Sequence, residues 1–213
     1  MKITKYEHAC MVVQKSSSSL IIDPGAYTTP LTDVTGVVAI VITHEHPDHW
    51  TPEHLKRILV KNPDARILGP AGVVAAAKDD DVTIEAVAEG DELDIGQFSL
   101  KFFGDKHAVI HESIPVIDNV AVLVDDNFYY AGDSFTLPPG PVDTLAVPIN
   151  APWLKVSEVM DYVMQVAPKR AFPVHEALLS KIGVSTYGPR IEWATARGGG
   201  EYLPLALGES LDL

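Results

Sequence analysis

An apolar run that ends in a cluster of histidines is the feature that most restricts how this sequence can fold. Residues Val37–Thr43 form a continuous series of apolar and β-branched side chains, which is typical of a strand buried on both faces. His44-Glu45-His46-Pro47-Asp48-His49 follows directly. A loop at the end of a buried strand is held firmly enough to aim several side chains at one point. We therefore expect a buried sheet with a functional loop at the end of this strand.

Strand-like and helix-like segments alternate along the whole sequence, with no repeat and no long linker. The predicted strands are Met11–Gln14, Leu20–Asp23, Val37–Thr43, Arg66–Gly69, Thr83–Val87, Phe98–Phe103, Asn119–Val124, Phe128–Ala131, Asp143–Pro148, Arg170–Val174 and the strand-like end Tyr202–Leu213. The predicted helices begin at Pro52 with Thr51 as N-cap, cover Gly72–Lys78, and run from Val156 to Ala167, with a weak helix after Val174. This unbroken interleaving predicts one α/β domain with two sheets over residues 1–213.

The cluster after the first buried strand contains four side chains that bind divalent metals. On an extended chain His44 and His46 point the same way, and Asp48 and His49 follow Pro47, where the chain must turn. The alternative is a polar loop of hydrogen-bonded histidines, which fits a lone histidine better than four ligand-type residues within six positions.

Three further ligand-type residues also follow predicted strands. His107 comes after Phe98–Phe103, Asp133 after Phe128–Ala131, and His175 after Arg170–Val174. Open α/β sheets place their active sites outside the carboxyl ends of strands, so these side chains are candidates for the same centre.

The order and spacing of these residues resemble the metallo-β-lactamase fold superfamily. The resemblance rests on His44-x-His46-x-Asp48-His49 followed by His107, Asp133 and His175. Leu20-Ile21-Ile22-Asp23-Pro24 and Ala131-Gly132-Asp133-Ser134 fit the same pattern, with Ser134 where the family often has Thr. Glu7-His8-Ala9-Cys10 is similar to the small intracellular branch that includes ascorbate-phosphate lactonase and phospholipase-D-like enzymes.

The resemblance implies an αββα sandwich of two mixed β-sheets flanked by helices, with a dinuclear metal site at one edge. His44, His46 and His107 would bind the first ion, Asp48, His49 and His175 the second, and Asp133 would bridge the two. Imidazole and carboxylate ligands without thiolates suit zinc first, with manganese or iron as alternatives. A hydroxide held between ions roughly 3.5–4 Å apart would be the nucleophile, and Asp48 is the candidate catalytic residue that orients it.

Other residues keep two interpretations each. His111 is the rival of His107, and His8 is either a hydrogen-bonding neighbour of the site or a structural histidine. Asp23 is expected to orient a ligand histidine or to form a turn before Pro24. The remaining residues are Trp153 (pocket wall or packing), Lys106 and Lys155 (contacts to an anionic substrate or solvent), Glu176 (electrostatics of the second ion or solvent), His54 (surface) and Cys10 (inert core).

Composition restricts the class of partner. The 213 residues carry a formal net charge of −13, which argues against binding to nucleic acid phosphates. Cys10 is the single cysteine, so an intramolecular disulfide and a Cys-rich zinc site are excluded. No stretch approaches the roughly 18 apolar residues of a transmembrane helix, and the first residues lack the apolar run of a signal peptide. We expect a cytoplasmic protein with a small-molecule substrate and no nucleic-acid or membrane partner, and leave a homo-oligomer open.

The sequence therefore predicts a metal-dependent hydrolase that cleaves an ester, lactone or phosphodiester of a small intracellular substrate. The alternative is a non-haem iron redox or dioxygenase-type protein on the same fold. Di-iron relatives of that kind usually carry a carboxylate within the first motif at a position where this sequence has His44 or His46, and an attached flavin domain, which is not seen here. A metal-binding module without catalysis is the third hypothesis.

Overall fold

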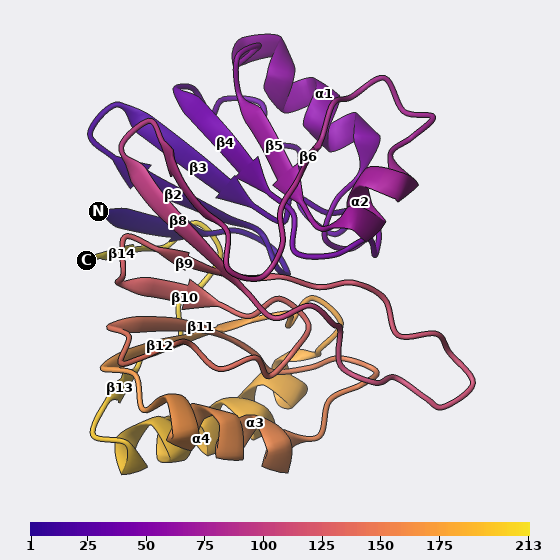
Figure 1. The fold of residues 1–213 in the computed structure, drawn as a ribbon. Helices are drawn as coiled ribbons and strands as arrows, with labels where there is room; N and C mark the ends of the chain where they lie inside the picture. The colour runs from indigo at the N-terminus through magenta and orange to yellow at the C-terminus, as the bar shows by residue number, and fades with distance from the viewer.

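In the computed structural model, which describes residues 1–213, two seven-stranded sheets face each other and helices cover the outer face of each (Figure 1). The first sheet has the order β14 (Ser210–Asp212), β1 (Lys2–Lys5), β2 (Met11–Lys15), β3 (Ser18–Ile22), β4 (Val37–Val41), β5 (Arg66–Gly69) and β6 (Glu85–Ala86). The second has the order β13 (Glu201–Tyr202), β12 (Arg170–Val174), β11 (Thr144–Pro148), β10 (Phe128–Tyr130), β9 (Ala121–Val124), β8 (Phe98–Phe103) and β7 (Glu92–Ile95). The expected sandwich of two mixed sheets is confirmed.

Helices α1 (Pro52–Lys61) and α2 (Ala71–Ala76) lie on the first sheet, and α3 (Val156–Val166) and α4 (Lys181–Arg197) on the second (Figure 1). The side chain of Thr51 accepts a hydrogen bond from the backbone N–H of His54, which confirms the predicted N-cap of α1. The helix after Val174 is longer than its sequence suggests, since Pro189 lies inside α4.

Alternation along the strands divides the interior into three layers. In β3, Leu20 and Ile22 point between the two sheets, whereas Ile21 points toward α1 and α2. In β4, Ala39 faces the inter-sheet layer and Ile40 the helices. This is the side-chain period of two that a strand buried on both faces requires, and it explains why Val37–Thr43 reads as continuously apolar.

Strand direction brings the ends of several strands to one edge. β3 and β4 are parallel, as are β10, β11 and β12, while β8 is antiparallel to β9 and β9 to β10. The carboxyl ends of β8, β10 and β12 therefore lie at the same edge of the second sheet. An isolated bridge between His44 and Asn119 joins this edge to the end of β4, and the backbone N–H of Val120 donates to the carbonyl of Thr43 at 2.9 Å.

Three segments differ from the sequence-based expectation. β1 and β7 are strands that the pattern did not predict, and β6 contains two residues of the expected Thr83–Val87 strand. Between β13 and β14 the chain leaves the sheets, so Tyr202–Leu213 is not one strand. No helix has both the length and the apolar character needed to cross a membrane.

Candidate metal centre

The first group of ligand-type side chains consists of His44, His46 and His107, whose ligand atoms all lie within 4.8 Å of one another. Nε2 of His44 lies 3.1 Å from Nδ1 of His46. Nδ1 of His107 donates to the carbonyl oxygen of Ala108 at 2.5 Å, so its proton is on Nδ1 and its Nε2 carries a lone pair. This Nε2 is buried and has no hydrogen-bond partner.

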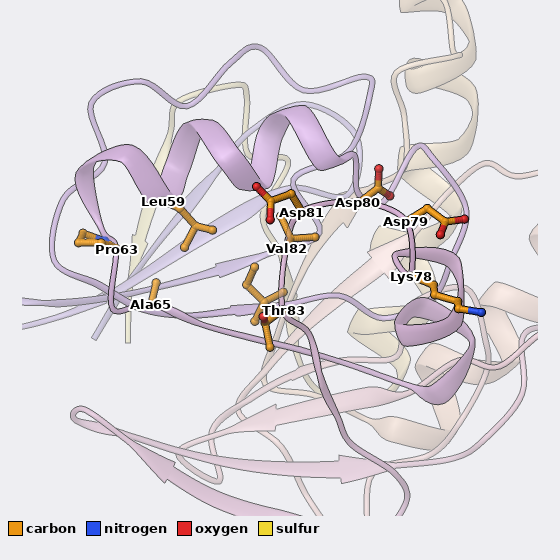
Figure 2. Close-up of a pocket in the computed structure, with 10 residues that line it drawn as sticks. Leu59, Pro63, Ala65, Lys78, Asp79, Asp80, Asp81, Val82 and Thr83 are labelled. Carbon is orange, nitrogen blue, oxygen red and sulfur yellow. The ribbon is translucent and has the colours of Figure 1, made fainter.

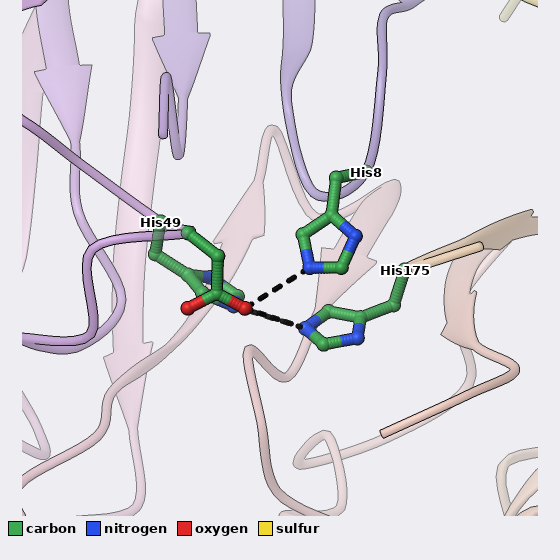
Figure 3. A group of neighbouring side chains, drawn as sticks. His8, His49 and His175 are labelled. Atoms are coloured by element: carbon green, nitrogen blue, oxygen red, sulfur yellow. Dashed lines mark hydrogen bonds and ion pairs between the residues drawn. The ribbon is translucent and has the colours of Figure 1, made fainter. Parts of the chain in front are cut away.

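The second group consists of Asp48, His49 and His175, and the structure adds His8 to it (Figure 3). Nε2 of His49 and Nε2 of His175 face each other at 3.1 Å. Oδ2 of Asp48 lies 3.9 Å from the former, 3.7 Å from the latter and 3.0 Å from Nε2 of His8. The sequence left two interpretations of His8 open, and this contact favours the one in which His8 is a hydrogen-bonding neighbour of the site.

Asp133 lies between the two groups. Its Oδ1 is 3.4 Å from Nε2 of His49 and 3.3 Å from Nε2 of His175, and its Oδ2 is 3.5 Å from Nε2 of His107. Oδ1 is buried without a hydrogen-bond donor, whereas Oδ2 accepts a hydrogen bond from Nε1 of Trp153 at 2.8 Å. Asp133 is therefore the one carboxylate that reaches both groups.

Neighbouring polar groups fix the side chains of the candidate ligands His49 and His175. Asp23 is fully buried, and its Oδ2 accepts from Nδ1 of His49 at 2.7 Å, as expected for a residue that orients a ligand histidine. Nδ1 of His175 donates to the carbonyl oxygen of Asn150 at 2.6 Å. In both histidines the bonded nitrogen is Nδ1, so Nε2 is the atom that points into the centre.

Two glycines allow the chain to pass close to the centre. A Cβ on Gly25 would lie 1.8 Å from the carbonyl oxygen of Asp48. Gly132 has φ +63°, and a Cβ there would lie 2.4 Å from Oδ1 of Asn119, which accepts the backbone N–H of Asp133 at 3.0 Å. Larger side chains at either position would displace a candidate ligand.

The environment of the cluster shifts the pKa values of His44 and His49 in opposite directions. Burial, followed by the nearby charge of His49, lowers the pKa of His44 well below the ordinary value. Burial also acts to lower the pKa of His49, but the carboxylates of Asp133 and Asp23 outweigh it and raise this pKa to about 9.

Two carboxylates of the cluster, Asp48 and Asp133, have lowered pKa values. Burial raises the pKa of Asp48, but the hydrogen bond from His8 and the charge of His49 prevail and bring it to about 2. The same competition between burial and the charges of His175 and His49 holds the pKa of Asp133 well below its usual range.

The residues present fit divalent metal ions. Ring nitrogens face each other at hydrogen-bond distance, and His107 Nε2 and Asp133 Oδ1, which belong to the proposed ligands, are buried without a hydrogen-bond partner. Buried polar atoms normally have partners, so unpartnered atoms inside a ring of imidazoles and carboxylates are expected where a cation binds. Nitrogen and oxygen donors without thiolate are compatible with zinc, manganese or iron.

The other candidates lie outside the ligand groups. His111 is exposed, and its Nδ1 lies 2.8 Å from Oγ of Ser113. His54 was expected at the surface and is buried instead, because it lies four residues before the buried Ile58 on the inner face of α1. Cys10 is buried, and burial raises the pKa of its thiol.

Trp153 is buried, packs edge-on against His107 at 6.0 Å between ring centroids, and bonds to Asp133. The charged candidates have partners of their own: Lys106 pairs with Asp118, Lys155 is 3.7 Å from Glu158, and Glu176 pairs with Lys5.

Two surface pockets differ in whether they include a residue of the candidate metal centre. The largest of them, about 670 Å³, lies against α1 and includes Leu59, Lys78 and the residues 79–81 (Figure 2). It contains none of the ligand-type residues. A groove of about 420 Å³ has His8 in its wall, together with apolar side chains such as Leu179 and Leu207.

Comparisons with known proteins agree with this architecture. A family model described as the beta-lactamase superfamily domain matches residues 2–175. Protein Rv0786c of Mycobacterium tuberculosis is 37% identical over 196 residues, which cover 90% of this chain and 91% of that protein.

Two solved structures show the same fold. Igni18, a metallo hydrolase from Ignicoccus hospitalis, superposes with a TM-score of 0.74 at 15% identity, covering 99% of this chain and 97% of that chain. CmlA, a diiron β-hydroxylase from Streptomyces venezuelae, superposes with a TM-score of 0.75 at 15% identity, covering 100% of this chain and 54% of that chain.

Proposed function

The chain belongs to the beta-lactamase superfamily, and from this premise we propose that it is a metal-dependent hydrolase that cleaves an ester, lactone or phosphodiester. The observation that carries the proposal is the position of Asp133, whose two oxygens face the two ligand groups. His44, His46 and His107 would hold one ion, and Asp48, His49 and His175 the other. Zinc is the proposed metal, with manganese or iron as alternatives.

Two bound metal ions would lower the pKa of a water molecule, so that a hydroxide nucleophile exists near neutral pH. They would also neutralise the negative charge that develops on the substrate oxygen. The protein's own contribution is to hold the candidate ligands in place and to orient the nucleophile. Asp48 is partly exposed, and its Oδ2 is engaged by His8. Its Oδ1 makes no hydrogen bond within the protein and would be the atom that orients the attacking hydroxide.

We propose a small molecule of the cytoplasm as the substrate, with no nucleic-acid or membrane partner. The net charge of −13 opposes binding to the phosphate backbone of a nucleic acid. The groove of about 420 Å³ beside His8 lies within the range of roughly 300–1,000 Å³ that is usual for small-molecule sites.

The first test is the metal content of protein purified without added metal, measured by elemental analysis beside a screen of ester, lactone and phosphodiester substrates. We expect close to two ions per chain and turnover of at least one substrate class, which chelation abolishes and zinc restores. Protein that binds no metal even after reconstitution would refute the proposal.

Oxidation at a di-iron centre is the second candidate, and the structural likeness to CmlA is the observation that favours it. The second group, with His49, His175 and Asp48, also matches the two-histidine, one-carboxylate set of non-haem iron, whereas the first group consists of three histidines. Iron in the purified protein, together with oxygen consumption and no hydrolysis, would replace the hydrolase proposal with this one.

A further inference from the structure

His8 occupies a constrained position beside the second ligand group. It lies in the turn between β1 and β2 and is 1% exposed. Its backbone has φ 60°, a left-handed conformation that is uncommon for a residue other than glycine. The turn is closed by the backbone N–H of Tyr6, which donates to Cys10 at 2.9 Å. An uncommon conformation held by surrounding structure is a frequent property of functional sites.

This single residue contacts two of the proposed ligands of the second ion, Asp48 and His175. Its Nε2 lies 3.0 Å from Oδ2 of Asp48. Its carbonyl oxygen accepts the backbone N–H of His175 at 2.8 Å, and its ring lies 3.8 Å from the ring of His175 between centroids. His175 also has a left-handed backbone, with φ 69°, so His8 supports a ligand whose own conformation is uncommon.

The contact to Asp48 determines which role His8 can have. An ionised carboxylate only accepts hydrogen bonds, so Nε2 of His8 must carry the proton that joins the two residues. A nitrogen that carries a proton has no lone pair for a metal. Although His8 lies within reach of the second group, its Nε2 is therefore a donor to a ligand and not itself a ligand atom.

Asp48 depends on this donor because its other contacts are weak. Its side chain is 23% exposed and follows Pro47 in a loop, and its distances to His49 and His175 are 3.9 Å and 3.7 Å, too long for hydrogen bonds. The bond from His8 is the one hydrogen bond within the protein that fixes the direction of the carboxylate.

We propose that His8 is a positioning residue that holds Asp48 and His175 for the second metal ion, so that this ion, and not the first, depends on it. The inference rests on the proposed function, because it requires two ions. None of the first group, which is His44, His46 and His107, is hydrogen-bonded to His8. The dependence should therefore be selective.

The test is a calorimetric titration of ZnCl₂ into protein stripped by a chelator, with two variants of the same residue. His8→Phe keeps a ring against His175 but removes the donor. His8→Gln places an amide N–H near the position of Nε2 and so can restore the bond to Asp48. Loss of an outer hydrogen bond to a metal ligand typically lowers metal affinity about 10–100-fold.

We expect His8→Phe to weaken the second zinc by about 10–100-fold and the first by less than about twofold, and His8→Gln to recover most of the loss. The first zinc serves as the internal check of folding, because unfolded protein would lose both. Equal weakening of both ions, an unchanged second ion, or a Gln variant as weak as the Phe variant would each overturn the role of His8. Wild-type protein that binds fewer than two zinc ions would instead refute the dinuclear centre itself, and with it the ion that His8 is proposed to serve.

Discussion

Replacing Asp23 by asparagine tests whether a buried acid sets the ligand atom of His49. Oδ2 of Asp23 accepts from Nδ1 of His49 and from Oγ1 of Thr43, each at 2.7 Å, and Oδ1 accepts from the backbone N–H of Thr43 at 2.8 Å. Asparagine has a single side-chain oxygen, so it can accept either from the backbone N–H of Thr43 or from Nδ1 of His49, but not from both. If that oxygen keeps the backbone N–H, the amide group faces His49, whose Nδ1 must then accept.

The proton of His49 then moves to Nε2, the atom that faces His175 at 3.1 Å and that a metal would need. If the amide turns the other way, the buried N–H of Thr43 loses its acceptor. Either arrangement disturbs the second ligand group. Changes to such outer partners reduce metal affinity by about 10–100-fold, which corresponds to about 1.4–2.8 kcal/mol.

The assay is zinc titration of chelator-stripped Asp23→Asn, followed by calorimetry, with a circular dichroism melt to verify folding. Asp33→Asn is the matched control, because it removes the same charge from an exposed acid that pairs with Lys61 at the surface. Zinc affinity in Asp23→Asn within about twofold of the control, in folded protein, would refute the reasoning that Asp23 sets the tautomer of His49.

The remaining predictions concern the ligands, the close approach at Gly25 and pH. Asp133→Ala should lose both ions in elemental analysis, since its oxygens face both groups, and retention of two would contradict its bridging position. His107→Ala should lose the first ion while His111→Ala retains full metal content, and the reverse would identify His111 as the ligand. Gly25→Ala should lower the melting temperature and the affinity of the second ion, because its Cβ would overlap the backbone of Asp48, and calorimetric scanning should detect a loss of about 1–3 kcal/mol. In metal-free protein the raised pKa of His49 favours folding below its unfolded pKa of 6.5, so this contribution should disappear between pH 6.5 and about 9 in urea titrations, and His49→Gln should abolish that loss.

The candidate centre was accessible from the sequence because its ligands follow apolar strands. His44, Asp133 and His175 each come directly after a run of buried residues, and parallel strands carry such positions to one edge of a sheet. The seven proposed ligands lie together in the structure. Their roles as metal ligands stay a prediction until metal binding is measured.

Other features were not accessible because they depend on contacts between distant segments. His8 lies in a turn, where no periodicity applies, and its partner Asp48 is 40 residues away. The extent of α4 was not evident because Gly183 and Pro189 weaken the helical pattern, and contacts with α3 and β12 support it in the folded protein. His54 was assigned to the surface because it lies in the first turn of the predicted helix, although its spacing from Ile58 places both on the inner face of α1.

The seam between the two sheets, where His44 pairs with Asn119, has a consequence for cooperativity. The proposed ligands before residue 50 belong to the half built on the first sheet, and those after residue 100 to the half built on the second. Ions that bind only when both halves are in place favour the assembled state by mass action. Amide hydrogens of the two sheets should therefore exchange with a common protection in the loaded protein. After chelation each half can unfold locally without the other. Metal binding would therefore couple the unfolding of the two halves, and metal removal would uncouple it.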